Sequence, residues 1–431
     1  MAELSANDKT PEEALVHWVI VGTWGIWLAG GLYHVYPILA WTLGAWGFAR
    51  RCGLTNTDPE TLKPLPLAVW VWIAGMALMA FALIIGHLNF ELSLGDIIKS
   101  LLGWMKGWAL FAVLPFAGAS LRIRPQVLYR AINILSLQTL LIAPLFYLAS
   151  MSGLPPVLYT SPLYYLGGAP HTFFDVGTHW IDPGANDIRF RFYAPWSPAM
   201  AFTAQLAMVI GLFDRDWRWR IIAVVTALVV CTLAKSRLSV VGLPILMLAI
   251  PALSQLYRPA MVGVAGMAAF ASIFMFNTLS VLIDNGVDTF NNARADSSRV
   301  RATLQRIAFH RWESEAPFFG HGAVERGSHL VEFMPIGSHH TWYGLLFVKG
   351  GVGFLALAGP FLWTFVEILI KAQRDRVARA SLGVLLVMFI NSFGENLEIL
   401  SYLAWPGLLL IGIALSRRTV GVWSATLGTH R

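Results

Sequence analysis

Twelve apolar runs, each long enough to cross a lipid bilayer, constrain what this chain can fold into more than any other feature. A membrane-spanning helix needs about 17 to 25 mostly apolar residues. Runs of that kind fall at 14–31, 33–49, 66–88, 98–120, 127–150, 196–213, 217–234, 238–256, 259–278, 342–370, 377–394 and 399–416. Only 13% of the 431 residues are charged, about half the share in soluble domains. The sequence therefore predicts an all-α, polytopic transmembrane bundle of about 12 spans, built as one integral membrane domain over residues 1–431.

The first two apolar runs leave two topologies open. Ala14–Trp46 is nearly continuous, and only Gly30-Gly31 indicates a tight reversal between two short helices. If this stretch is a single span, the N-terminus lies outside, while the later segments keep their orientation. The polar N-terminal residues include no basic region ahead of the first run, so we expect no cleaved signal peptide.

Loop charges predict the orientation of the bundle. Lys and Arg accumulate in cytoplasmic loops of membrane proteins. Alternate loops of the expected arrangement hold Arg50, Arg51, Arg122, Arg124, Arg130, Arg215, Arg218, Arg220, Arg258, Lys371, Arg374, Arg376 and Arg379. These loops and both termini are therefore expected in the cytoplasm, and the net charge of +7 reflects this bias rather than nucleic-acid binding. The two largest connections, 151–195 and 280–340, then lie on the outer, periplasmic side.

The outer segment 280–340 breaks the charge rule. It carries Arg294, Arg299, Arg301, Arg306, Arg311 and Arg326, and ends in Ser338-His339-His340-Thr341-Trp342. Arginines are scarce in short outer loops, so we interpret the cluster as a site for an anionic ligand. Large loops without clear periodicity are usually functional. Taken singly, the arginines are also explained by solvated salt bridges to nearby carboxylates such as Asp296, Glu315 and Glu325.

Two further groups of basic residues belong to the same side. Arg189 and Arg191 stand where the segment 151–195 re-enters the membrane, and Lys235 and Arg237 occupy the tip between two spans. Guanidinium forks suit phosphate oxygens, and several at one point would stabilise a pyrophosphate leaving group. A histidine suits proton transfer from a sugar hydroxyl. The alternatives are snorkelling for the first pair and interaction with a helix C-terminus for the second.

Nothing in the sequence indicates metal or nucleotide chemistry. The outer carboxylates are scattered singly, and the two cysteines lie far apart. Neither a Walker motif nor a G-x-G-x-x-G motif after a strand occurs. We therefore expect a metal-independent mechanism without a cofactor.

The segment that begins at His339 resembles the signature of the O-antigen ligase and polymerase superfamily, in which a His-Asn pair precedes an aromatic residue, a Leu-rich turn and Gly-x-x-Gly. Here it reads His339-His340-Thr341-Trp342-Tyr343-Gly344-Leu345-Leu346-Phe347-Val348-Lys349-Gly350-Gly351-Val352-Gly353-Phe354. Three more segments are similar to family motifs: Ser298-Arg299-Val300-Arg301 with the turn 316–322, Ser236-Arg237, and the span entry 191–198. These motifs cover residues 185–360, in the family's order.

The resemblance implies an inverting transfer of a glycan from undecaprenyl pyrophosphate to an acceptor hydroxyl, at the periplasmic face of the bacterial inner membrane. Carried over by position, Arg237 and one of Arg299 or Arg301 act on the pyrophosphate, and His339 is the base. His340 replaces the family's usual Asn, so either histidine remains a candidate base, although the spacing to the glycines favours His339. The further candidates for substrate binding are Arg189, Arg191, Lys235, His340 and Trp342.

Three functions stay open at this point. One is a polymerase that joins lipid-linked repeat units of an O-antigen, capsule or exopolysaccharide, and another is the ligase that moves O-antigen onto lipid A–core. We favour the polymerase because the outer loops show no basic surface beyond the site for a phosphorylated lipid A–core. A lipid-linked oligosaccharide transporter would place charges in mid-span, but the centres of these spans are nearly free of acids and bases, with Lys106 the main exception. Expected partners are the undecaprenyl-pyrophosphate-linked glycan and membrane lipid; the family implies a chain-length regulator and a flippase, and no nucleic acid.

Overall fold

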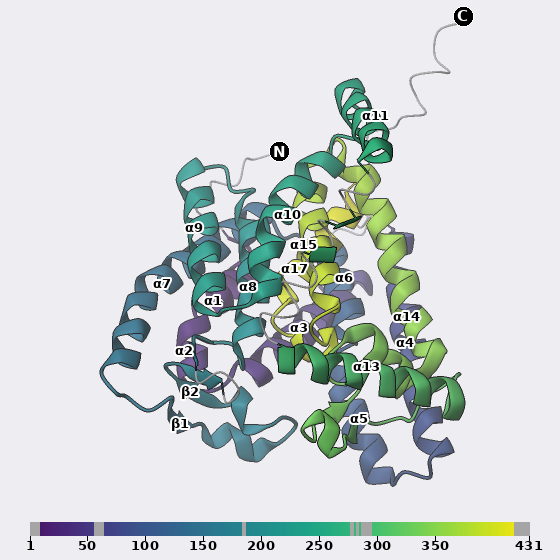
Figure 1. Cartoon of the computed structure of the whole chain (residues 1–431). Helices are drawn as coiled ribbons and strands as arrows, with labels where there is room; N and C mark the ends of the chain where they lie inside the picture. The colour runs from purple at the N-terminus through teal and green to yellow at the C-terminus, as the bar shows by residue number, and fades with distance from the viewer. Residues whose placement is uncertain are drawn as a thin grey trace, which may run out of the picture.

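The computed structural model describes residues 9–55, 64–182, 187–275, 280–281, 284–285 and 295–417. It is mainly helical, and each predicted span falls on a helix or on a pair of helices (Figure 1). The helices are α1 (Pro11–Val21), α2 (Thr23–Leu28), α3 (Leu32–Arg51), α4 (Leu67–Asn89), α5 (Leu94–Lys106), α6 (Leu110–Ser120), α7 (Pro125–Met151), α8 (Ser197–Gly211), α9 (Trp217–Leu233), α10 (Arg237–Leu253), α11 (Pro259–Phe274), α13 (Ala295–Glu315), α14 (Thr341–Ala372), α15 (Arg376–Ser392), α16 (Leu397–Leu400) and α17 (Trp405–Ser416).

Four helical segments of the described chain are long and apolar enough to cross a membrane. They are Leu67–Asn89, Leu94–Ser120, Pro125–Met151 and Thr341–Ala372. The second comprises α5 and α6, which meet at an irregular turn around Gly107. Shorter apolar helices, among them α8, α10 and α17, contribute to the same buried core as these long segments. By length and composition, the chain is that of a helical membrane protein.

The loops that the charge pattern places on one side meet at one end of the bundle. The side chain of Asp214, between α8 and α9, accepts a hydrogen bond from Arg130 of α7 at 2.8 Å. Its backbone carbonyl oxygen accepts another from Arg376, at the start of α15, at 3.2 Å. Glu13 near the start of α1 is ion-paired with Arg124 at 2.6 Å. Ion pairs and hydrogen bonds of charged side chains thus hold together helix ends from distant parts of the sequence, as expected if these loops share one surface.

Arg294, which belongs to the cluster predicted on the opposite side, lies outside the described residues.

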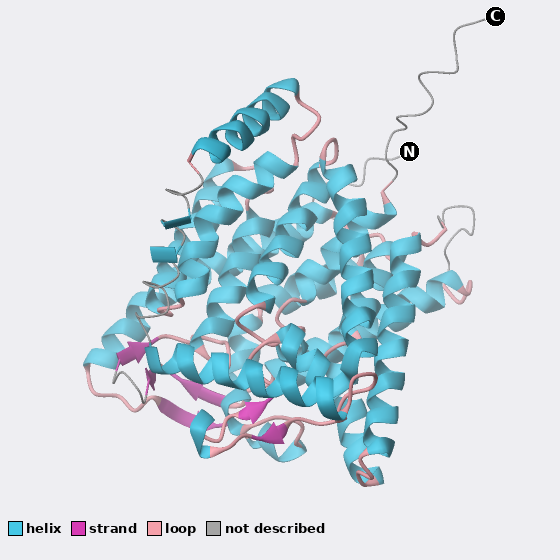
Figure 2. Ribbon diagram, turned by 45° about the vertical axis from the view of Figure 1, so that its right-hand side comes forward, coloured by secondary structure: helices cyan, strands magenta, loops and turns pink. Residues whose placement is uncertain are grey.

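The opposite end of the bundle carries the two large connections (Figure 2). The segment 151–195 folds into two small antiparallel pairs, and 280–340 contributes a third. The pairs are β1 (Val157–Thr160) with β2 (Asp175–Gly177), β3 (Trp180–Asp182) with β4 (Asp187–Arg189), and β5 (Glu325–Arg326) with β6 (Pro335–Ile336). These short strands fix the loops over the helix ends without forming a continuous sheet.

The segment 280–340 is not the aperiodic loop that the sequence predicts. Its centre is α13, a helix of 21 residues that lies across this end of the bundle (Figures 1 and 2). Val300, Leu304 and Ala308 recur at intervals of four and are buried in a cluster with Phe347 of α14. One apolar side chain per turn is a narrow stripe in a highly charged sequence, so sequence periodicity alone does not reveal it.

The helix α11 also departs from the span predicted at 259–278. It comprises 16 residues, and its described side chains are almost all exposed. In Figure 1 it projects beyond the bundle, at the end opposite α13. The described part of this apolar run is therefore helical as predicted, but the structure does not pack it among the other helices. Residues 276–279 lie outside the described residues.

A break in α14 fixes the position of the turn 316–322 against the bundle. Gly350 interrupts the helix with φ 65° and ψ −168°, which leaves neighbouring backbone groups without helical partners. Such groups must be paired within a membrane protein. The turn pairs them through four bonds: the N–H groups of His321 and Gly322 donate to Phe347 and Val348, and those of Gly351 and Val352 donate to Pro317 and Phe318.

The side chain of His321 links this turn to α13. His321 belongs to this tight turn, and its buried ring stacks on Phe347 with centroids 4.3 Å apart. One ring nitrogen bonds the Glu315 carboxylate at 2.8 Å, and Glu315 is ion-paired with Arg311 at 2.7 Å. For Arg311, the salt-bridge interpretation is therefore confirmed. This network ties the C-terminal end of α13 to the break in α14.

Candidate functional site

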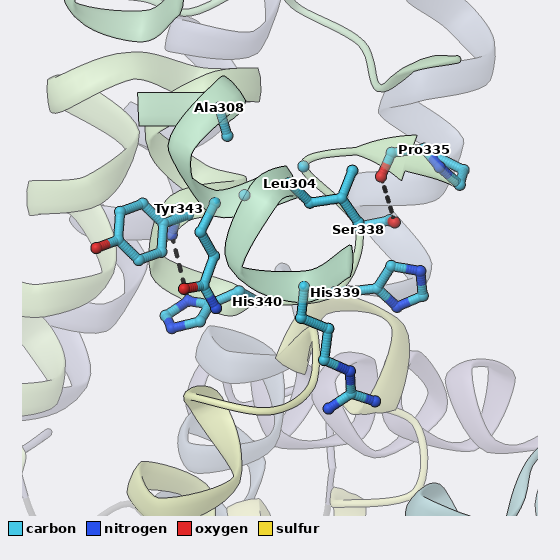
Figure 3. Close-up of a pocket in the computed structure, with 11 residues that line it drawn as sticks. Leu304, Ala308, Pro335, Ser338, His339, His340 and Tyr343 are labelled. Atoms are coloured by element: carbon cyan, nitrogen blue, oxygen red, sulfur yellow. Dashed lines mark hydrogen bonds between the residues drawn. The ribbon is translucent and has the colours of Figure 1, made fainter. Parts of the chain in front are cut away.

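A small pocket opens where α13 crosses the beginning of α14 (Figure 3). One helical face of α13 forms its first wall, because residues spaced by three, four or seven positions share a face. The lining residues are Arg301, Leu304, Gln305 and Ala308 from α13, with Pro335, Gly337, Ser338, His339, His340, Tyr343 and Gly344 from the strand–helix connection and α14. Two of the predicted catalytic residues, Arg301 and His339, thus meet in one cavity.

Arg299 and Arg301 lie on different faces of α13. A two-residue step turns an α-helix by about 200°, so the two side chains cannot serve the same pocket. Arg301 is half-buried, lines the pocket and donates to the carbonyl oxygen of Gly394 at 3.4 Å. Arg299 is exposed. Of the two alternatives, the structure brings only Arg301 to His339.

The adjacent histidines have different environments. Their rings point to different sides in Figure 3, His340 toward Tyr343 and His339 away from it. The Nδ1 atom of His340 accepts the backbone N–H groups of Trp342 and Tyr343, at 3.2 and 3.4 Å. His340 is therefore the N-cap of α14, a position that an Asn side chain also fills well. Its Nδ1 lone pair is engaged in holding the helix.

The ring of His339 makes no hydrogen bond to any residue in the part of the chain that the structure describes. Burial, followed by the positive charge of Arg301, lowers the pKa of His339 to about 4. Both causes disfavour the protonated form. At neutral pH the imidazole is therefore uncharged and can take up a proton.

Glu395 is a residue of this region that sequence reasoning did not assign to the site. It lies in the short connection between α15 and α16, where its carboxylate accepts the indole N–H of Trp196 at 3.0 Å. Burial raises the pKa of Glu395, against the opposing effect of Arg301 and Arg189. The only signal in the sequence is the pair of acids, Glu395 and Glu398, in a very short connection between two apolar runs, which is a costly place for charge.

Arg189 and Lys235 form a separate basic group beside this connection. The Arg189 guanidinium donates to the backbone carbonyl oxygen of Lys235 at 2.7 Å. Lys235 is exposed, adopts a left-handed φ of 48° after α9, and pairs with Asp187 at 3.2 Å. Two predicted binding residues are therefore brought together, and the charge of Arg189 reaches Glu395.

Arg237 is the first residue of α10, whereas α9 ends at Leu233. Its neighbour Leu238 packs against Gly394, where an added Cβ would lie 2.8 Å from the Leu238 Cδ2 atom. Gly394 also accepts the hydrogen bond from Arg301. The start of α10 and the pocket face of α13 therefore approach the same connection, with Arg237 beside it.

Arg191 and Trp342 do not line the pocket in this structure. Arg191 is only 1% exposed and donates to the carbonyl oxygen of Pro195 at 3.2 Å, so the snorkelling interpretation does not apply to it. The Trp342 indole N–H donates to the Ser392 hydroxyl at 2.9 Å, which joins α14 to α15. Both side chains stabilise the surroundings of the pocket.

Within the described ranges, no three His, Cys, Asp or Glu side chains gather as a metal-binding group. The polar groups of the region are instead guanidinium donors, an uncharged imidazole and one half-buried carboxylate. This arrangement can bind an anion and accept a proton next to it.

No protein-family model matches the sequence, and no curated protein matches it. The resemblance of its motifs to the O-antigen ligase and polymerase superfamily therefore stays a prediction.

Proposed function

We propose that the protein is a polysaccharide polymerase of the bacterial inner membrane. It joins undecaprenyl-pyrophosphate-linked repeat units on the periplasmic face. The chain crosses the membrane about 12 times, and the segments 151–195 and 280–340 lie in the periplasm. The observation that carries the proposal is the pocket shared by Arg301 and His339. A fixed guanidinium fork suits a pyrophosphate, and an uncharged imidazole beside it suits proton transfer.

The proposed reaction is a displacement at the anomeric carbon of the donor glycan. The acceptor hydroxyl oxygen forms the new bond to this carbon, while the bond from the carbon to the pyrophosphate oxygen breaks. The hydroxyl proton passes to His339, and the bonding electrons leave with undecaprenyl pyrophosphate. Arg301 stabilises the charge that develops on this leaving group, with Arg189 and Arg237 nearby. Attack opposite the leaving group inverts the anomeric configuration.

The electrostatics of the pocket suit this sequence of events. Burial, together with the charge of Arg301, lowers the pKa of His339 and keeps the ring uncharged, ready to accept a proton. A bound pyrophosphate would offset the charge of Arg301 and raise the pKa of His339, which makes the ring a better base when the donor is present. His340 takes no part in proton transfer, because its Nδ1 atom caps α14.

A ligase would use the same pocket and differ in its acceptor, so the choice of polymerase rests on the outer loop surface. The near absence of charged residues from the centres of the spans speaks against a transporter, with Lys106 as the main exception. Lys106 ends α5 at the irregular turn before α6, and its ammonium lies against Gly168 of the segment 151–195. It is therefore near the bundle end that carries α13.

The glycan phenotype of a deletion strain tests the proposal. A polymerase defect leaves single repeats on the carrier lipid, whereas a ligase defect leaves long chains on it. Wild-type protein should restore chain elongation, and a H339A variant produced at the same level should not. Restoration by both proteins would remove His339, and with it the proposed site, from the reaction.

A further inference from the structure

Lys106 belongs to a second cationic cluster that the proposed reaction does not use. Its ammonium lies 5.1 Å from the centroid of the Tyr33 ring. An added Cβ at Gly168 would lie 2.7 Å from the same ammonium, so the Lys106 ammonium is in close contact with the backbone of the segment 151–195. In the part of the chain that the structure describes, no carboxylate lies within ion-pair distance of Lys106.

The surroundings of Lys106 contain one ion pair and one unpartnered imidazole nitrogen. Lys349, buried in α14, is paired with Glu398 of α16 at 3.1 Å. Glu398 also packs on Gly107, whose added Cβ would lie 2.8 Å from the glutamate Cγ atom, but its charge is already matched by Lys349. On α3, His34 lies within reach of the charge of Lys106, and its Nε2 atom is buried without a hydrogen-bond partner among the described residues. The cluster is therefore short of negative charge.

A row of aromatic rings connects this cluster to the first pocket. Trp196, which donates to Glu395, packs edge-on against Phe173 with centroids 5.6 Å apart. Phe173 in turn lies 4.9 Å from Tyr33, which faces Lys106. Trp196, Phe173 and Tyr33 are all half-exposed. Partly exposed rings of this kind offer apolar faces and polar edges between the two cationic clusters.

Polymerisation needs two anion sites. The donor and the acceptor of the proposed reaction are both lipid-linked glycans, so each brings a phosphate headgroup to the membrane surface. The Arg301 pocket accounts for one headgroup. Because like-charged headgroups repel, a second cation at a separate position is needed to hold the other while the sugars meet between them.

We propose that Lys106, with His34 beside it, forms a second anion site that takes the phosphate headgroup of the acceptor lipid. This inference rests on the proposed function. It places the acceptor glycan along the row Tyr33–Phe173–Trp196, with its hydroxyl directed toward His339. Lys349 and Glu398 position the adjoining end of α16 through their ion pair.

The stoichiometry of headgroup binding tests the inference. Purified full-length protein in detergent is titrated with geranylgeranyl pyrophosphate and examined by native mass spectrometry. The wild type should bind two equivalents, K106Q one and R301Q one. Lys99 is an exposed lysine on the same helix, so K99Q is the matched control and should bind two. K106R keeps the charge and should also bind two, which separates loss of the cation from any general effect at this position.

The outcomes distinguish the two proposals. A single equivalent on the wild type, lost in R301Q and kept in K106Q, overturns the second site and leaves the proposed function standing. Unchanged binding in R301Q overturns the proposed function. A competition experiment with phosphorylated lipid A identifies the acceptor. If it displaces one equivalent of geranylgeranyl pyrophosphate from the wild type and none from K106Q, the second site exists. Its ligand is then the acceptor of a ligase and not a second polyprenyl pyrophosphate.

Discussion

Arg301 of α13 and His339, just before α14, line one pocket, and the charge of Arg301 helps burial to lower the pKa of His339 to about 4. The residue next in sequence, His340, instead accepts two backbone N–H groups as the N-cap of α14. A tandem pair of histidines is thus divided between two tasks. One holds the helix in place, and the other faces the cavity as an uncharged imidazole.

Substitution of each histidine should separate these tasks. H339A should lower the rate of glycan elongation by about 10²–10⁴-fold, the usual cost of removing a general base. H340N should retain most of the activity, because an Asn oxygen can accept the same backbone N–H groups. Elongation rates on purified, equally stable variants decide the matter. A dead H340N beside an active H339A would reverse the assignment.

The stability of the protein should fall in mild acid. The pKa of His339 and of His340 drops from 6.5 to about 4 on folding. Between these values the unfolded chain binds more protons, so stability is complete above the unfolded pKa and decreases as the pH falls from 6.5 toward 4. The unfolding temperature in detergent should decrease over this window, and less steeply in a H339Q/H340N double variant. Identical slopes for the two proteins would contradict the pKa shifts.

The two arginines of α13 should differ sharply in importance. R301K replaces a fork of donors by a point charge, and we expect a loss of activity of about 10²-fold. R299Q changes an exposed side chain on another face and should leave activity within about twofold of the wild type, since exposed ion pairs contribute little. Parallel measurements of kcat and KM provide the comparison. Equal losses in both variants would mean that α13 acts through its net charge alone.

Glu395 should weaken binding of the donor. Its carboxylate interacts electrostatically with Arg301 and Arg189. A bound pyrophosphate would interact with the same two positive charges and would be repelled by this carboxylate. E395Q keeps an acceptor for the Trp196 indole but removes the negative charge, so we expect a lower KM for the donor lipid. E395A also loses the bond to Trp196 and should unfold at a lower temperature than E395Q. A higher KM in E395Q would show that the carboxylate assists binding.

The break in α14 should tolerate only glycine. An added Cβ at Gly350 would lie 2.2 Å from the Phe318 carbonyl oxygen, and its φ is 65°. We expect G350A to cost about 3 kcal/mol or more, or to abolish folding. Gly359 lies on the same helix with nothing within 4 Å of an added Cβ, so G359A should be neutral or slightly stabilising. Thermal unfolding of the two variants tests the difference, and equal stability would disprove a strained break.

Much of the helical architecture follows from the sequence. Apolar runs of span length specify helices wherever the backbone must satisfy its own hydrogen bonds, so each predicted span is indeed helical. The same reasoning cannot predict whether the resulting helix packs within the bundle. The run at 259–278 becomes α11, which stands apart from the bundle, and α13 escaped prediction because its buried stripe is one residue wide.

The candidate residues also followed from the sequence, but their partnership did not. Composition and spacing singled out Arg299, Arg301, His339 and His340 as chemistry-bearing groups on one side of the membrane. The sequence could not choose between the members of either pair. In the structure, the pitch of α13 places only Arg301 on the pocket that His339 lines, and His340 caps α14.

The sequence by itself determined a helical membrane protein with an unusual concentration of basic groups on one surface, because apolarity and charge are local properties of the chain. Only the tertiary structure decided that Glu395 lies beside that surface, that Arg191 is enclosed within it, and that Lys106 faces a backbone turn. These facts depend on contacts between segments far apart in sequence, whose geometry is set by how the helices pack and bend.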